Sequence, residues 1–422
     1  MVLLMNGKMT RHSLFLFLIA IWVIAGCSSE KEIAPPDNLI GLWHTHYNDG
    51  LMVLQKVNAV AYNPLNNLSV IALEPTIPGQ ANIIKIAYNP KMSRGEQIRA
   101  DFAQVTNGPI RNVRISSEYT AFSGRTRELI LLKDELFYAK FDLDDEITSI
   151  EFSEKDKNIL AVGDRQGKLL IIDLGKLSIL NTVQLFDGEI TSLAFYKDDQ
   201  LLVSGNGSRV FQVDIRSGKT ERTIETEGLK GKILHATGLK HCVKDRINQV
   251  LYVESEDKII TAHGWDYCRD FRVKVLDASS GRLLKEITQP KHPVFHMVWM
   301  SKPQLLVFVD HGRNLWRLSL SDLSLAAPRF LPQSLARYGS MENRKEKAAI
   351  NFGDIQSLIS IPGTNYLLMG VGAYFKGGSG VLLTELTAGA MKNLAHLTID
   401  IEGNAHLFVH EKLFNEMQPP RS

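Results

Sequence analysis

The sequence has little of what usually identifies a ligand class. Only three of its 422 residues are cysteine, and no two are spaced as Cys-x-x-Cys, so no metal site is predicted. Its 48 basic residues are nearly balanced by 46 acidic ones, which leaves no long-range attraction for phosphate backbones. Nucleic-acid binding is therefore not expected. With 44% hydrophobic and 22% charged residues, the composition is that of a globular protein rather than a disordered or polytopic one.

The N-terminus lacks an apolar run long enough to cross a membrane. The apolar stretch Leu14–Ala25 has 12 residues. As a helix it would be about 18 Å long, which is well short of a hydrocarbon core of about 30 Å. Lys8 and Arg11 precede this stretch, and a glycine follows it. A basic start, a short apolar core and small residues are the layout of a secretory signal. An uncleaved anchor helix is the alternative.

The stretch IAGC at 24–27 resembles the lipobox of bacterial lipoproteins. The resemblance implies cleavage before Cys27, acylation of the cysteine (palmitate being one such chain) and attachment to a membrane. In that family the residue after the cysteine influences sorting, and Ser28 favours the outer membrane, on its periplasmic side. The chain then begins with a signal peptide over 1–26. An acylated cysteine and a flexible, proline-containing tether follow over 27–38.

One six-residue pattern recurs through the rest of the chain: aliphatic, two residues, aliphatic, one residue, then usually aromatic. Its seven copies are VNAVAY at 57, IRNVRI at 110, ITSIEF at 147, ITSLAF at 190, INQVLY at 247, VFHMVW at 294 and IQSLIS at 355. Successive copies begin 37 to 61 residues apart. The alternation within each copy is typical of a strand with one buried face.

Each clear unit continues with three further strand-like segments. After ITSLAF the chain reads QLLVSGNGSRVFQVDIRSGKTERTI, which contains an apolar strand, a glycine-rich turn, a second apolar strand, a turn and a last strand. Gly163, Gly205 and Gly218 are expected in turns that need positive φ or close packing. Four antiparallel strands per unit, about seven times, predict an all-β chain with a β-propeller over 39–415 and a tail over 416–422.

The sequence does not decide which segment closes the ring. Residues 49–56 could supply the outer strand of the last blade, and residues 405–414 could either do the same or begin an eighth blade. Two stacked β-sandwich domains are the competing architecture, because they also have short strands at regular spacing. Seven copies of one pattern favour seven blades over that alternative.

The units resemble those of the WD-repeat family. The four-stranded unit of that family has an aspartate at the end of the third strand, matched here by Asp173, Asp214 and Asp277. Aliphatic residues replace the family's tryptophan before this aspartate, and the Gly-His pair that opens a typical repeat is absent. The segment VKVLDASSGRLLKEI also resembles the repeats of quinoprotein-type propellers. These resemblances imply a propeller more firmly than membership of any one family.

Two of the three cysteines belong to the fifth unit. Cys242 precedes its first strand, and Cys268 lies between its second and third strands. Both connections emerge on the same face of a propeller blade, so the two thiols are expected to be neighbours. An exported protein folds in an oxidising compartment, where such a pair is normally joined as a disulfide. Two separate thiols are the alternative.

No stretch of the sequence forms a recognisable catalytic constellation. The glycine-rich segment 370–380 lies between two apolar strands, whereas a phosphate-binding loop precedes a helix. No paired carboxylate motif stands out. The sequence therefore predicts no catalytic residue, no metal ligand and no cofactor. Catalysis nevertheless stays open, because propeller enzymes assemble their sites from residues far apart in sequence.

Partner binding is expected where loops lengthen the repeat. Residues 225–246 extend the loop that leads to the fifth unit. Trp265 and Tyr267 would lie beside this loop and are good interface anchors if they are exposed. Burial of both side chains inside the blade is the alternative.

These features together predict a lipid-anchored protein of the bacterial cell envelope. Its propeller is expected to bind another envelope protein, without catalytic activity of its own. The alternative is a propeller enzyme or small-ligand binder, such as a hydrolase, lactonase or quinoprotein relative, that uses the mouth of the central channel. The expected partners are a membrane, through the N-terminal lipid, and a protein, but no nucleic acid.

Overall fold

A computed structural model describes the ring of the protein. The residues described are 56–63, 68–74, 82–88, 98–103, 105–106, 108–124, 126–134, 136–197, 199–226, 246–264, 271–330, 334–335, 350–351, 354–372, 380–386, 391–399 and 405–409. Within them, strands are almost the only regular structure; the exception is one 3-10 turn, η1 (Glu254–Glu256). None of the described helical segments is long and apolar enough to cross a membrane.

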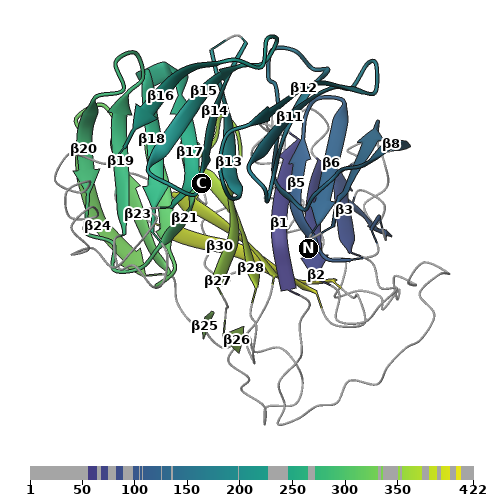
Figure 1. Cartoon of the computed structure of the whole chain (residues 1–422). Coiled ribbons are helices and arrows are strands. Elements are labelled where there is room, and N and C mark those ends of the chain that lie inside the picture. The colour runs from purple at the N-terminus through teal and green to yellow at the C-terminus, as the bar shows by residue number, and fades with distance from the viewer. Residues whose placement is uncertain are drawn as a thin grey trace, which may run out of the picture.

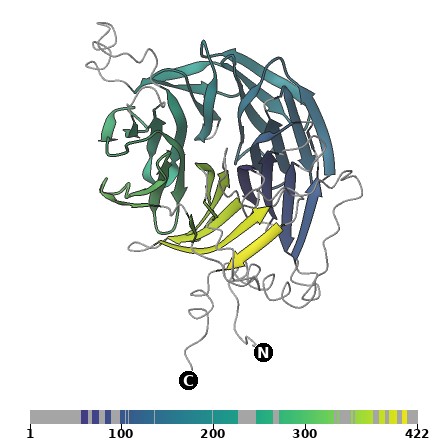
Figure 2. The same cartoon turned by 90° about the horizontal axis from the view of Figure 1, so that it is seen from below.

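Seven antiparallel sheets stand around a common axis as the blades of a propeller (Figures 1 and 2). The first four blades are four-stranded. Their strands are, for blade 1, β1 (Lys56–Asn63), β2 (Leu68–Glu74), β3 (Ile83–Tyr88) and β4 (Ile98–Ala103); for blade 2, β5 (Ile110–Ile115), β6 (Tyr119–Gly124), β7 (Glu128–Lys133) and β8 (Leu136–Asp142); for blade 3, β9 (Ile147–Phe152), β10 (Ile159–Asp164), β11 (Lys168–Asp173) and β12 (Ser178–Gln184); and for blade 4, β13 (Ile190–Tyr196), β14 (Gln200–Gly205), β15 (Arg209–Asp214) and β16 (Thr220–Glu225).

The remaining three blades complete the ring, and a small two-stranded sheet is separate from the blades. Their strands are, for blade 5, β17 (Ile247–Val253), β18 (Lys258–His263), β19 (Arg272–Asp277) and β20 (Leu283–Ile287); for blade 6, β21 (Val294–Met300), β22 (Leu305–Asp310), β23 (Asn314–Leu318) and β24 (Leu325–Phe330); and for blade 7, β27 (Asp354–Ser360), β28 (Tyr366–Gly372), β29 (Gly380–Leu386), β30 (Met391–Ile399) and β31 (Ala405–Val409). The two-stranded sheet pairs β25 (Ser334–Leu335) with β26 (Ile350–Asn351).

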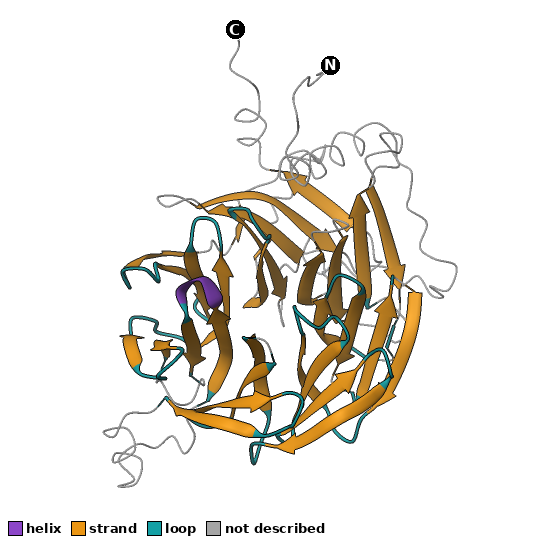
Figure 3. Ribbon diagram, turned by 90° about the horizontal axis from the view of Figure 1, so that it is seen from above, coloured by secondary structure: helices purple, strands orange, loops and turns teal. Residues whose placement is uncertain are grey.

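The strands form a closed ring when the molecule is seen from above (Figure 3), and the first strand of each blade carries the six-residue motif. Every first strand packs against the first strands of the two neighbouring blades, and β27 packs against β1 to close the circle. A prediction of seven blades is therefore confirmed, and two stacked sandwiches are excluded. An eighth blade was the wrong alternative: β31 pairs with β30 and becomes a fifth strand of blade 7. Residues 49–55, the other segment considered for closure, lie outside the described residues.

All seven first strands have a β-bulge at the second residue of the motif. The pairing with the second strand shifts register there in each blade, between the residues Val57/Ala59, Ile110/Asn112, Ile147/Ser149, Ile190/Ser192, Ile247/Gln249, Val294/His296 and Ile355/Ser357. A bulge leaves one residue out of the ladder and re-aims its side chain. In four of the seven blades, this extra side chain reaches the next blade.

Those side chains bond the blades to one another. The amide of Asn58 donates to the carbonyl of Ile110 at 2.9 Å, and the amide of Asn248 donates to the carbonyl of Val294 at 2.9 Å. The hydroxyls of Thr148 and Thr191 donate in the same way to the first motif residue of the following blade. A first strand has no strand neighbour on its inner edge, and an unpaired buried carbonyl costs about 1–3 kcal/mol. The bulged side chains supply the missing donors.

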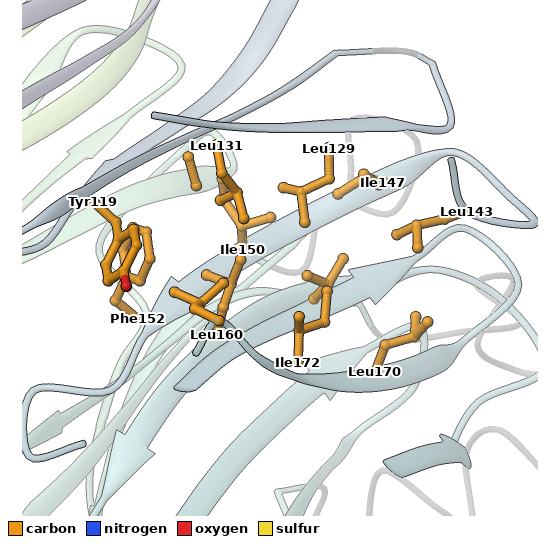
Figure 4. Close-up of a cluster of buried hydrophobic side chains, with 13 residues drawn as sticks. Tyr119, Leu129, Leu131, Leu143, Ile147, Ile150, Phe152, Leu160, Leu170 and Ile172 are labelled. Carbon is orange, nitrogen blue, oxygen red and sulfur yellow. The ribbon is translucent and has the colours of Figure 1, made fainter. Parts of the chain in front are cut away.

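The blades also meet through apolar clusters. Between blades 2 and 3, residues from β6, β7, β9, β10 and β11 form one such cluster (Figure 4). Leu160 and Ile172 in this cluster are fully buried. Second and third strands are covered on both faces by neighbouring blades, which is why their sequences are nearly continuous apolar runs. The outer strands, in contrast, alternate between exposed and partly buried residues.

The three glycines expected in turns divide into two groups. Gly218 has φ +68° and lies in a turn, as predicted. Gly163 and Gly205 instead lie inside β10 and at the end of β14. A Cβ on Gly163 would come within 2.5 Å of the side chain of Ile190, and one on Gly205 within 2.6 Å of a backbone oxygen. Close approach of the chain, and not turn geometry, therefore requires glycine at these two positions.

The aspartates that resemble those of WD repeats stabilise the turns between third and fourth strands. Asp277 accepts hydrogen bonds from Ser280 N at 2.7 Å and from Ser280 Oγ at 2.6 Å. Asp214 accepts from the backbone N–H and the hydroxyl of Ser217, and Asp173 accepts from the backbone N–H of Lys176. These hydrogen bonds lower the pKa of each carboxyl group. The bonds from serine have the largest effect at Asp277 and Asp214, and the backbone bond from Lys176 has the largest effect at Asp173. The aspartates that resemble those of WD repeats thus have a structural role.

Candidate functional site at the mouth of the channel

A pocket of about 260 Å³ opens where the first strands of blades 3, 4 and 5 end. We call it the mouth pocket. It is lined by Glu151, Phe152, Ser153, Glu154, Lys155, Leu193, Ala194, Phe195, Lys197, Leu251, Tyr252 and Glu254. The face of the ring that carries it, here the mouth face, holds the connections from first to second and from third to fourth strands. In blade 3 these two connections touch, because Leu174 N donates to Asn158 O at 2.7 Å.

The fifth residue of the motif differs from blade to blade, and in blades 3 to 5 it lines the pocket. The seven residues at this position are Ala61, Arg114, Glu151, Ala194, Leu251, Val298 and Ile359. Only Arg114 and Glu151 are charged. This motif position is therefore aliphatic or small in the other five blades, and its two charges lie on the neighbouring blades 2 and 3.

Arg114 and Glu151 form an ion pair between blades 2 and 3. Arg114 Nε lies 3.0 Å from Glu151 Oε2, and the two side chains are 42% and 30% exposed. Burial raises the pKa of Glu151, while the guanidinium of Arg114 opposes this rise. A partly exposed pair of this kind contributes little to stability. Its importance lies in placing a fixed, partly desolvated carboxylate in the wall of the pocket.

His296, the third motif residue of blade 6, also responds to Arg114. Burial above all, together with the positive charge of Arg114, lowers the pKa of His296 to about 4. The imidazole is therefore neutral at physiological pH.

The blade 5 side of the pocket is aromatic and already hydrogen-bonded. Tyr252 donates its hydroxyl to Asp257 Oδ1 at 3.0 Å and packs edge-on against Tyr196, with ring centroids 4.7 Å apart. Burial and the neighbouring Asp257 raise the pKa of Tyr252. Lys197 lies 4.9 Å from the centroid of the Tyr196 ring and 3.9 Å from Asp257 Oδ1. These contacts fix the orientation of this wall.

Glu154 and Glu254 complete the charged rim of the pocket. Both residues are exposed, and no hydrogen bond or ion pair joins either carboxylate to another described residue. Among those residues there is also no group of three histidine, cysteine, aspartate or glutamate side chains placed to hold a metal ion. The mouth pocket thus combines aliphatic and aromatic walls with two carboxylates that no other described residue pairs, an arrangement suited to binding an amphipathic cationic group.

The residues predicted from the sequence are not those of the mouth pocket. Cys27, Cys242, Cys268, Trp265 and Tyr267 all lie outside the described residues, so the lipid anchor, the disulfide and the partner anchors stay predictions. Reading the motif copies in register, column by column, would have found the Arg114–Glu151 pair in the wall of the pocket. The fifth column is aliphatic or small except for the Arg–Glu pair at the second and third copies.

Comparison with known proteins supports the fold. No family model matches the sequence, and no curated protein matches it either. Among solved structures, the chain is similar to the WD40 β-propeller domain of Doa1, with a TM-score of 0.54 and 13% sequence identity. The match covers 76% of this chain and 92% of that one. A likeness at this identity shows a WD40-like propeller fold and nothing about function.

Proposed function

We propose that the protein is an interaction scaffold, tethered by a lipid on Cys27 to a membrane of the bacterial cell envelope, and that its partner docks at the mouth face. The mouth pocket is the observation that carries the proposal, because three blades together build a site with apolar walls and with two carboxylates that pair with no other described residue. The WD40-like fold agrees with this role, since propellers of this kind commonly bind proteins.

Membrane tethering and partner binding are tested together by isolating the full chain from membranes. A C-terminally tagged protein and its Cys27→Ala variant are compared for incorporation of an alkyne-labelled palmitate and for proteins recovered after gentle solubilisation. The proposal expects label, membrane retention and a reproducible protein partner for the wild type, and loss of label and retention for the variant. Equal labelling of both proteins contradicts the anchor, and recovery of no partner contradicts the scaffold.

A second function, hydrolysis or binding of a small ligand, is favoured by one observation. Glu151 has a raised pKa and lines a pocket, which is a feature of catalytic carboxylates as well as of buried ion pairs. The test is turnover of a panel of lactones and aryl esters by the wild type and by Glu151→Gln. Turnover that disappears in the variant supports this function, and equal rates for both proteins oppose it.

A further inference from the structure

The side chains that line the mouth pocket carry one more negative than positive charge, which favours the binding of one cation. The lining includes three carboxylates, Glu151, Glu154 and Glu254, against the two ammonium groups of Lys155 and Lys197, an excess of one negative charge. Glu151 is engaged by Arg114, and Lys197 lies close to Asp257. The carboxylates that face a guest are therefore those of Glu154 and Glu254.

The size and walls of the pocket fit a single long side chain. Its volume of about 260 Å³ falls just below the range of about 300–1,000 Å³ that is usual for sites of drug-sized ligands. Leu193, Ala194 and Leu251 provide aliphatic wall for a methylene stem, and Phe195 and Tyr252 provide half-buried rings. Arginine and lysine have such a stem and a cationic head that interacts favourably with aromatic faces and carboxylates.

The same face of the ring carries an apolar surface that a small cation would not need. Five of the six large hydrophobic side chains exposed among the described residues lie on the outer strands of blades 2 and 3 or the turn before β12: Leu136, Phe137, Leu177, Ile179 and Leu180. We call them the rim patch. Leu136 and Phe137 are 74% and 69% exposed.

The rim patch and the mouth pocket are joined across the mouth face. Tyr138, next to Phe137, donates its hydroxyl to the carbonyl of Leu174 in blade 3 at 2.9 Å. That turn bonds in its own blade to Asn158, at the end of the connection that contributes Glu154 and Lys155 to the pocket. An apolar rim on the same face as a charged pocket, and linked to it by these hydrogen bonds, fits a chain of residues better than an isolated ligand.

We propose that an extended polypeptide of the partner lies across the mouth face, with one arginine or lysine side chain in the mouth pocket and apolar side chains on the rim patch. This inference rests on the proposed function, because it names the part of the partner that the scaffold would hold. Charge complementarity with Glu154 and Glu254 selects a basic residue, and the rim patch selects a polypeptide over a free amine.

The inference is tested by photo-crosslinking with the full chain in the cells that produce it. Benzoylphenylalanine replaces Lys155 at the pocket in one protein and Gln166, on the opposite face of blade 3, in another. The crosslinked partner peptides are then sequenced by mass spectrometry. The probe at 155 is expected to capture a peptide with arginine or lysine within about three residues of the crosslink, since successive extended residues are about 3.3 Å apart.

Charge reversal at the pocket supplies the matched comparison. Combining Glu154→Lys and Glu254→Lys should lower the yield at position 155 by about tenfold or more, which is the loss expected for removing a charge-assisted contact. The control Asp144→Lys reverses an exposed acid on the opposite face and should leave the yield unchanged. Phe137→Ser should lower the yield as well. Thermal melting of each variant confirms that it is folded.

The outcomes separate the inference from the proposed function. Crosslinks at 155 whose peptides lack basic residues, or whose yield survives the double reversal, overturn the inference. Crosslinks only at 166 also overturn it, and with it docking at the mouth face, but they leave the role of the protein as an interaction scaffold standing. Absence of crosslinked protein at both positions, together with no partner recovered from membranes, overturns both.

Discussion

The interface between blades 2 and 3 and the mouth pocket share strands but differ in the residues that those strands contribute. At the interface, Ile147 and Ile150 of β9 are 2% and 1% exposed and belong to an entirely apolar cluster. The next residue along the same strand, Glu151, is charged and lines the pocket. The positions of Ile147 and Ile150 are apolar in all seven motif copies, whereas the position of Glu151 varies. Repeated positions therefore hold the ring together, and the varying position gives one part of it a distinct chemistry.

The largest effect is expected from a change inside the interface. Leu160→Ala removes a fully buried side chain from the cluster between blades 2 and 3. The free energy of unfolding should fall by about 2–5 kcal/mol because the packed neighbours cannot fill the cavity. Urea unfolding followed by tryptophan fluorescence measures it. The control Leu180→Ala removes a side chain that is 41% exposed and should change stability far less. Equal losses would contradict the assignment of the interface as the core.

The next largest effect concerns the bonds between blades. Asn248 donates to the carbonyls of Gly264 at 2.8 Å and Val294 at 2.9 Å, and its side chain is buried. Asn248→Ala should destabilise the protein by about 1–3 kcal/mol, since two carbonyls lose their donor. Asn181→Ala is the control, because Asn181 also donates to two carbonyls, but at a more exposed turn. If both variants lose the same stability, burial does not decide the effect.

A pH effect of intermediate size is expected from His296. Its pKa is lowered to about 4 in the folded protein, from an ordinary value of 6.5, so the unfolded chain binds the proton more readily between these values. Stability should therefore fall as the pH is lowered from about 6.5 towards 4. Urea midpoints at several pH values should show a shallower dependence for His296→Gln. An identical pH dependence of the wild type and this variant would contradict the assignment.

The smallest effect is expected at the rim of the pocket. Glu154→Ala and Glu254→Ala alter exposed side chains with no hydrogen bond or ion pair to another described residue. Each should change the free energy of unfolding by less than about 0.5 kcal/mol, as surface substitutions usually do. A loss comparable with that of Leu160→Ala would show that the pocket belongs to the structural part of the molecule.

The sequence predicted the fold because the residues that form it repeat. A motif with fixed apolar positions indicated one inner strand per blade, and the count of copies matched the count of blades. The sequence did not decide whether residues 405–414 belong to the last blade or begin an eighth one. Only the pairing of β31 with β30 assigns β31 to blade 7 as its fifth strand. Gly163 and Gly205 were expected in turns because the residues that pack closely against them come from other strands and connections. Such a contact leaves no pattern in the neighbouring sequence.

The mouth pocket was not predicted, for a related reason. Glu154, Lys197 and Glu254 belong to three different units and become neighbours only when the ring closes. Each is an ordinary charged residue in a connection or strand end when read along the chain. Arg114 and Glu151 are 37 positions apart, yet they form an ion pair because both occupy the fifth motif position of adjacent blades.

Docking of a partner at the mouth face can be measured directly. The wild type and the combined Glu154→Lys, Glu254→Lys variant are isolated from membranes in equal folded amounts, and the recovered partner is quantified by mass spectrometry. The amount of partner recovered with the variant should fall about tenfold or more, with unchanged thermal stability. Equal recovery of the partner with both proteins would contradict it.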